Sequence, residues 1–269
     1  MSAVMREANA PGRLGRWSLT VAGWLVYAFL YVPLIIVILY SFNADSINAW
    51  PIHHWSFGAY NTLANDADLT QSIKNSLYVS VIAVSIAVIL GTAAALGFNR
   101  LRIPGKELFS FAVILPIVLP GIVTGIAMLT LFTDLNYNLS LTTIIAGHVT
   151  FCIVLVFNSV RARLARVPAQ MAEAARDLGA GPFRTFWHVT LPSIRTAVIS
   201  GTLLAFTLSF DEVVVSFFLA GRENTLPLEI WSRLRRSTIT PEINAAATLL
   251  IAVSVVLVGA ARFLVREEE

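Results

Sequence analysis

The sequence predicts an all-helical, polytopic membrane protein with six transmembrane helices and both termini in the cytoplasm. Three observations support this fold class: the composition, the apolar runs and the placement of basic residues. Hydrophobic residues make up 57% of the 269 residues and charged residues 13%, and the mean hydropathy is +0.74. Soluble domains are about 45–50% apolar and about 25% charged. This composition excludes an ordinary soluble enzyme, and its low charge excludes a disordered chain.

Six runs are long enough to cross a bilayer, which takes about 20 mostly apolar residues in a helix. The first run exceeds the about 7–15 apolar residues of a signal peptide, so we expect it to remain as a helix. Together the runs define one transmembrane domain, residues 19–265, between an N-terminal tail of residues 1–18 and an acidic tail of residues 266–269. The predicted spans are residues 19–42, 76–98, 108–132, 141–160, 196–220 and 243–265.

The basic residues decide the orientation, because Lys and Arg gather in cytoplasmic loops. With the N-terminus inside, 14 of the 19 Lys and Arg residues lie on the cytoplasmic side and 5 lie outside. This asymmetry places both termini in the cytoplasm. Four of the five exceptions lie in one outer loop, residues 221–242.

Nucleic-acid binding and metal binding are not expected. The pI of about 9.3 comes from basic residues that are scattered between apolar blocks. Cys152 is the one cysteine, so it cannot form an intrachain disulfide or a zinc site of the usual ligand number. His53 and His54 are adjacent and lack the i, i+4 spacing of two ligands on one helix face.

The loop between the fourth and fifth spans, residues 161–192, carries the most specific pattern in the chain. Residues 169–178 are good helix formers, and Gly179 with the Gly-Pro pair at 181–182 ends that helix. A second short helix can begin at the proline. Such a hairpin either lies on the lipid surface or docks a soluble partner. The second helix presents three aromatic residues on one side: Phe183, Phe186 and Trp187.

This loop resembles the cytoplasmic signature of permease subunits of binding-protein-dependent ATP-binding-cassette (ABC) importers. The pattern is Glu-Ala-Ala, three residues, Gly, nine residues, an aliphatic residue, one residue and Leu-Pro, and the chain matches it throughout. Six spans with both termini inside also match, so the resemblance implies the ABC importer permease fold. In that family the loop docks in a groove of the ATPase subunit. The matching residues here are Glu173, Ala174, Ala175, Gly179, Val189, Leu191 and Pro192.

The resemblance also implies partners and cofactors. The chain has no Gly-x-x-x-x-Gly-Lys-[Ser/Thr] phosphate loop, so we expect that it is not an enzyme and holds no cofactor itself. ATP and Mg would be used by a separate dimer of ATP-binding subunits. A second homologous permease and a periplasmic solute-binding protein would complete the assembly in the lipid membrane. The resemblance places the chain in a bacterial inner (cytoplasmic) membrane.

Two adjacent carboxylates, Asp211 and Glu212, lie inside the predicted fifth span. A charged residue at the centre of a spanning helix costs about 2.5–3.5 kcal/mol on the insertion scale. In a continuous helix Ser209, Glu212 and Ser216 share one stripe, which is the better candidate for a wet surface along a translocation path. Anionic walls favour a cationic solute. The alternative is a structural role, with the carboxylates satisfied by hydroxyl or backbone groups at a helix interface.

The residues around these carboxylates resemble the polyamine branch of the importer family, closest to the second permease subunit of spermidine/putrescine transporters. The similar stretches are residues 208–221, 224–228 and 240–245. Related importers share parts of them, so an opine, thiamine or a metal chelate is an alternative solute. A proton-coupled secondary transporter using Asp211 and Glu212 is an alternative of another class, and it leaves the loop 161–192 unexplained.

Helix breaks are expected in the third span, which contains Pro116, Pro120 and Gly121. Proline bends a helix and frees a carbonyl, so these three are candidates for gating, and a static kink is the alternative. In the fourth span we expect His148 to form an interhelical hydrogen bond. Three outer arginines would repel a polyamine and are expected to meet an acidic patch of the binding protein or solvent: Arg233, Arg235 and Arg236.

Overall fold

The computed structural model describes residues 13–45, 48–100, 105–119, 121–168, 170–236 and 240–266. Within these ranges the chain is helical, which confirms the predicted class, and it forms no strand beyond an isolated antiparallel bridge. Five helices are long and apolar enough to cross a membrane, and a bent pair makes a sixth if it counts as one span. The helices are α2 (Arg13–Tyr40), α3 (Gly58–Asn65), α4 (Ala67–Arg100), α5 (Lys106–Val118), α6 (Gly121–Asp134), α7 (Leu141–Leu164), α8 (Gln170–Asp177), α9 (Pro182–Thr185), η1 (Phe186–Thr190), α10 (Leu191–Phe210), α11 (Val214–Leu219), α12 (Leu226–Arg235) and α13 (Pro241–Arg266).

The chain divides into two compact units. One comprises Met1–Thr62 and Ile239–Thr248, and the other comprises Leu63–Thr238 and Leu249–Glu269. The second unit contains α4 to α12, and it therefore holds all the predicted site residues.

The first unit contains α2 and the loop that follows it. This loop folds back on itself, because the Ala44 N–H donates to the His54 carbonyl at 2.9 Å and the Ser56 N–H donates to the Phe42 carbonyl at 2.8 Å. The ring of Phe42 packs against that of Tyr60 at 5.4 Å. The loop leads into the short helix α3.

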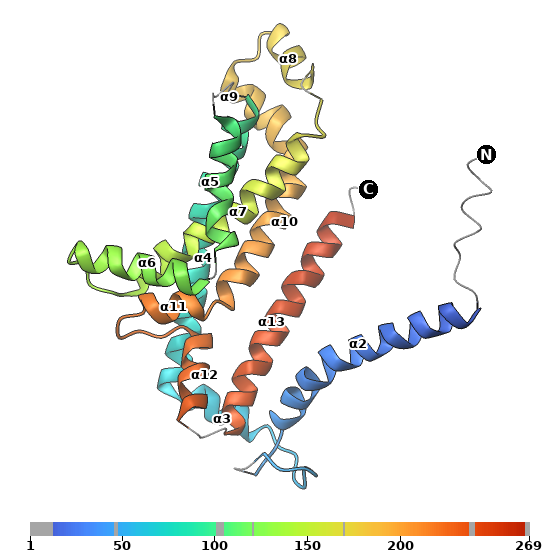
Figure 1. The fold of residues 1–269 in the computed structure, drawn as a ribbon, viewed down its shortest axis with the longest axis vertical. Coiled ribbons are helices and arrows are strands. Elements are labelled where there is room, and N and C mark those ends of the chain that lie inside the picture. Colours follow the sequence, from blue (N-terminus) through green and yellow to red (C-terminus); the bar gives the residue numbers. More distant parts are fainter. Residues whose placement is uncertain are drawn as a thin grey trace. The chain divides into compact units, whose positions relative to one another are not determined.

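The core of the second unit is formed by α4, α7 and α10, which pack along one another (Figure 1). Gly91 on α4 permits this close packing, because a Cβ there would lie 3.0 Å from the Ile153 carbonyl oxygen of α7. Small residues serve this purpose at helix crossings in membranes. The buried side chains include Val79 and Ala83 of α4, Val156, Phe157 and Val160 of α7, and Ile194 and Ala205 of α10.

The predicted second span is longer than expected. The sequence predicts this span at residues 76–98, whereas α4 has 34 residues. At about 1.5 Å per residue it is about 51 Å long. A bilayer core is about 30 Å thick. The first turns of α4 therefore extend beyond the apolar run. Asp66, directly before α4, and Ser76, at the start of the apolar run, both form hydrogen bonds with the segment that contains α12.

The predicted third span is not one helix. α5 ends at Val118 and α6 begins at Gly121, and the two axes differ by 101°. Leu119 is extended, with φ −68° and ψ 138°, as expected for a residue that precedes a proline. The predicted kink is therefore a sharp turn, after which α6 lies across the bundle (Figure 1).

The predicted fifth span is also interrupted. α10 ends at Phe210, and α11 begins at Val214. Asp211 and Glu212 lie in the intervening turn, so they do not occupy a continuous helix as expected. α11 then packs against α6 and α7. It can approach α7 because a Cβ at Gly147 would lie 2.5 Å from the Leu219 side chain.

The two ends of this unit carry different elements. α8 and α9 lie at one end of the bundle formed by α5, α7 and α10, and α12 lies at the opposite end (Figure 1). The predicted cytoplasmic loop and the predicted outer loop are thus separated by the length of the bundle.

Candidate functional site

α8 ends in a Schellman motif that depends on Gly179. This residue has φ 83°, a left-handed conformation that glycine adopts without steric cost. The Gly179 N–H donates to the Arg176 carbonyl at 2.9 Å, and the Ala180 N–H donates to the Ala175 carbonyl at 3.0 Å. The predicted end of the first loop helix is confirmed, and so is the start of the next helix at Pro182.

The surface of α8 and α9 is open to solvent. No residue of α8 is buried, so Glu173 and Ala174 are accessible. Two apolar side chains nearby are strongly exposed, Leu178 at 89% and Phe183 at 77%. The Phe183 ring packs against Trp187 at 6.1 Å, as the sequence predicted. An exposed apolar patch with polar neighbours is typical of a protein or membrane contact.

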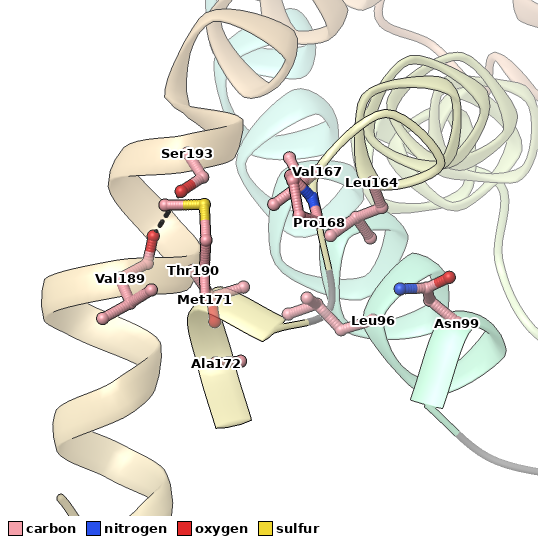
Figure 2. A pocket seen from close by; sticks show the side chains of 10 residues that line it. All are labelled: Leu96, Asn99, Leu164, Val167, Pro168, Met171, Ala172, Val189, Thr190 and Ser193. Carbon is pink, nitrogen blue, oxygen red and sulfur yellow. Dashed lines mark hydrogen bonds between the residues drawn. The ribbon is translucent and has the colours of Figure 1, made fainter. Parts of the chain in front are cut away.

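A cavity of about 60 Å³ lies where α8 meets the ends of α4, α7 and α10. Met171 of α8 and Val189 of η1 both line it (Figure 2). The Ser193 hydroxyl donates to the Val189 carbonyl at 2.6 Å, the dashed line in Figure 2. The aliphatic position of the signature therefore contributes to the contact between the loop and α10. Leu191 is half-buried at the start of α10, and Pro192 beside it is exposed.

A π turn, η1, joins the loop to α10. Residues Pro182–Phe210 form one helix of 29 residues, so the helix continues through Pro192. In a regular α-helix its ring would clash with the carbonyl four residues earlier. The π turn stands directly before it, and π turns inside helices are frequent at functional sites. The loop helix is therefore continuous with the interrupted fifth span.

The turn between α10 and α11 carries the two carboxylates. Glu212 accepts a hydrogen bond from the Val215 N–H through Oε1 at 3.0 Å, so it caps the N-terminus of α11. Glu212 is half-buried, and Asp211 is exposed in this chain. A helix break of this kind is tolerated at membrane depth only where it is buried in protein or lines a cavity.

His148 connects the two sides of this turn. Its Nδ1 lies 2.8 Å from the Ser209 hydroxyl on α10, and its Nε2 lies 3.0 Å from the Ser216 hydroxyl on α11. The Ser216 hydroxyl also donates to the Glu212 carbonyl at 2.9 Å. The predicted interhelical histidine is confirmed. Both serines are buried, and they converge because the chain turns, not because they share a helical stripe.

A second cavity, of about 190 Å³, lies beside the turn. Glu212 lines it, together with Pro116 and Gly121 from the ends of α5 and α6. The structure thus brings two candidate gating residues and one candidate path residue together. Pro120, the third gating candidate, lies outside the described residues.

Two of the arginines predicted for the outer loop, Arg233 and Arg235, contact different groups. Arg233 forms two hydrogen bonds with Asp66, at 2.7 and 3.0 Å, and a third with Glu229 at 2.7 Å. The hydrogen bond to Asp66 raises the pKa of Arg233, and the same guanidinium lowers the pKa of Asp66. Arg235 lies over the Trp231 ring at 4.9 Å. Arg233 therefore holds α12 on the start of α4, which corrects its expected position on a binding-protein surface.

Sequence reasoning missed two features that position these sites. The π turn has no sequence signal beyond Pro192. The pairing of Asp66 with Arg233 joins residues 167 positions apart, which composition and spacing in one chain do not reveal. The cap formed by Glu212 had a weak signal, because an acidic residue directly before an apolar run is typical of a helix start.

Comparison with known proteins agrees with the loop signature. A family model described as the binding-protein-dependent transport system inner membrane component matches residues 87–267. The chain is 37% identical over 252 residues to the putrescine transport system permease protein PotI of Escherichia coli (strain K12), which covers 90% of this chain and 88% of that protein. It is 36% identical over 246 residues to the spermidine/putrescine transport system permease protein PotC of Haemophilus influenzae, which covers 91% and 95%.

Solved structures share the fold. The crystal structure of a bacterial ABC transporter that imports alginate matches with a TM-score of 0.64 and 20% identity, over 96% of this chain and 98% of that one. The inward-facing MetNI methionine transporter matches with a TM-score of 0.61 and 15% identity, over 79% and 98%. With the family model covering most of the described bundle, this chain belongs to the inner-membrane components of binding-protein-dependent transport systems, a family of multi-pass transport permeases.

Proposed function

We propose that this chain is a permease subunit of an ABC importer that carries a polyamine, putrescine or spermidine, into the cell. The observation that carries the proposal is the 37% identity to a putrescine permease over 90% of the chain. A half-buried carboxylate, Glu212, beside a cavity supports a cationic solute, because an anionic wall favours cations.

The chain works with a second homologous permease, a dimer of ATP-binding subunits and a periplasmic binding protein in the bacterial inner membrane. One structural neighbour is an alginate transporter in complex with a periplasmic protein that holds a pentasaccharide, which supports delivery of the solute by such a protein. ATP and Mg act in the ATP-binding subunits, because this chain has no phosphate loop.

The loop 161–192 couples ATP use to transport. α8 docks on the ATPase through its exposed side, which includes Glu173, Ala174 and the Gly179 turn. Ala175, Val189, Leu191 and Pro192 connect this docked helix to α10. Continuity of the helix from Pro182 to Phe210 supports this role, because a displacement at the loop then reaches the turn at Asp211 without a flexible joint.

The membrane topology follows from the six apolar runs and the basic residues. α5 and α6 together form the third crossing, which gives six spans within residues 19–265. The tail of residues 1–18, the loop 161–192 and the tail of residues 266–269 lie in the cytoplasm. α12 then lies on the outer side, where the binding protein docks.

The translocation path passes the turn between α10 and α11. Asp211 and Glu212 face the solute, and Ser209 and Ser216 hold the turn through His148. Pro116, Pro120 and Gly121 are the gating residues, and a change in the bend between α5 and α6 opens or closes the path. Residues of both helix breaks line one cavity, and irregular backbone at membrane depth is tolerated where it lines a cavity.

Uptake by whole cells tests the proposal. Cells that lack this chain and retain its partner subunits should lose uptake of radiolabelled putrescine and spermidine, and the restored chain should recover it. Retained uptake without the chain would refute a polyamine function. Uptake of thiamine, an opine or a metal chelate in its place would identify another solute for the same importer. Uptake that survives loss of the ATPase subunit and stops with a protonophore would establish proton coupling.

A further inference from the structure

We propose that the 190 Å³ cavity between the two helix breaks binds the terminal ammonium group of an aliphatic amine, with Glu212, Thr124 and Phe151 as its contacts. This inference rests on the proposed function and adds the subsite at which the solute is held. Three independent features of the cavity support this inference. They are the Glu212 carboxylate, which has no cationic partner among the described residues, the Thr124 hydroxyl, which has no hydrogen-bond partner, and an otherwise apolar wall.

The cavity is built from five helices. Its lining comes from the end of α5, the start of α6, α7, the end of α10 and the turn leading into α11. At about 190 Å³ it far exceeds the about 10–15 Å³ that one water molecule needs. Both helix breaks therefore open toward one space that a small molecule can enter.

Glu212 supplies the negative charge. Its Oε1 accepts the Val215 N–H at 3.0 Å, which leaves Oε2 with no hydrogen bond from the described residues. Among these residues no basic side chain forms an ion pair with it. A half-buried carboxylate without a counterion is costly in apolar surroundings. A cationic ligand that enters the cavity supplies the missing partner.

Thr124 supplies a second polar atom. Its Oγ1 is buried and has no hydrogen-bond partner. Two other threonines of α6 differ, because Thr130 donates to the Ile126 carbonyl at 3.0 Å and Thr133 donates to the Leu129 carbonyl at 2.8 Å. Buried polar atoms without partners are rare in native proteins, so this hydroxyl has a ligand to meet.

An alkylammonium group fits this set of contacts. It has three N–H donors, and the cavity offers acceptors in the Glu212 carboxylate and the Thr124 hydroxyl. The Phe151 ring also lines the cavity, and an aromatic face attracts a cation. Apolar side chains, including Ile117 and Leu208, form most of the remaining wall and suit a methylene chain. Among the described side chains that line the cavity there is no cation for an anionic solute, and the Thr124 hydroxyl is the single neutral donor.

Cysteine labelling tests the subsite in the assembled transporter. In a Cys152→Ala background, Thr124→Cys should react with a cationic methanethiosulfonate, and putrescine should slow this reaction. At about ten times the half-protecting concentration, labelling should be about tenfold slower. Thr130→Cys on the same helix is the matched control and should be labelled equally with and without putrescine. Adding Glu212→Gln, which keeps the cap to Val215, should abolish the protection.

Uptake rates provide the second measurement. Glu212→Gln and Thr124→Val should each lower putrescine uptake about tenfold, the loss expected for a hydrogen bond to a charged group, and Thr124→Ser should retain it. Unchanged rates in both variants, or labelling that putrescine does not slow, would overturn the subsite. The proposed function fails separately, if the unmodified chain does not support polyamine uptake at all.

Discussion

Gly179 shows how one residue determines the shape of the loop that carries the family signature. A Cβ at this position would meet nothing within 4 Å, so space does not explain the glycine. The left-handed φ of 83° explains the glycine. In this region an L-residue is destabilised by about 1–2 kcal/mol, and asparagine by less. The requirement for glycine is therefore conformational and belongs to the end of α8.

Substitutions at Gly179 separate backbone conformation from surface contact. Gly179→Val should lower ATP-driven uptake about tenfold, because a β-branched residue in the left-handed region opposes the Schellman turn. Gly179→Asn should keep most of the activity. The measurement is uptake rate together with co-purification of the ATPase subunit at equal membrane levels of the chain. Equal loss in both variants would contradict the conformational explanation and assign the effect to contact with the partner.

At the scale of the elements, the interrupted helices depend on buried hydrogen bonds. α10 and α11 are separated by a three-residue turn, and His148 of α7 binds a serine on each side of it. Ser209 in turn lies 3.3 Å from Ser80 of α4. Four helices thus share one polar chain, which fixes where the fifth span turns.

Removal of the imidazole should loosen this turn. His148→Ala should destabilise the transporter by about 2 kcal/mol, from two hydrogen bonds at about 0.6 kcal/mol each in membranes and from a cavity. His148→Gln can still reach one serine and should lose less. Thermal unfolding of the purified complex measures the effect, and Cys152→Ala, a smaller truncation one turn along α7, is the control. A melting temperature for His148→Ala equal to that of the control would show that the turn is held elsewhere.

The end of the bundle that carries α12 has its own connection. Arg233 joins α12 to Asp66 through two hydrogen bonds, and the Ser76 hydroxyl accepts the Leu226 N–H at 2.7 Å. These contacts hold α12 in place at the face where we expect the binding protein. Arg233, which the sequence suggested as part of a docking surface, thus stabilises the packing of α12 against the start of α4.

At the scale of the whole molecule, the number of membrane crossings decides on which side of the membrane α8 and α12 lie. With the N-terminus inside, six crossings place α8 inside and α12 outside, whereas five crossings would place α8 outside and α12 inside. The bent pair of α5 and α6 is the element on which this count depends, because its axes differ by 101°.

Accessibility of single cysteines measures this topology. In the Cys152→Ala background, Asn138→Cys should react with a membrane-impermeant maleimide added to intact spheroplasts. Ser2→Cys and Glu269→Cys should react only after the membrane is opened, because both termini are proposed to be cytoplasmic. Labelling of Glu269→Cys in intact spheroplasts would mean an odd number of crossings and would remove the bent pair as a span.

The sequence alone was sufficient for the class, the apolar runs and the loop signature. Composition and hydropathy are properties of residues in order, and the Schellman turn at Gly179 is local, so both could be recognised without a structure. The family followed from spacing within the loop 161–192. Even the aromatic side of α9 and η1 was predictable, because it depends only on helical periodicity.

Only the tertiary structure decided how the membrane segments turn and which polar groups meet. The sequence from Ser209 to Ser216 is compatible with a continuous helix. The turn that interrupts it is stable because His148 bonds to both serine hydroxyls and the Val215 N–H donates to the Glu212 carboxylate. The pairing of Asp66 with Arg233 and the cavity that Thr124 and Glu212 both line bring together distant parts of the chain. Such contacts depend on how helices pack in three dimensions, and the order of residues along one chain does not encode them locally.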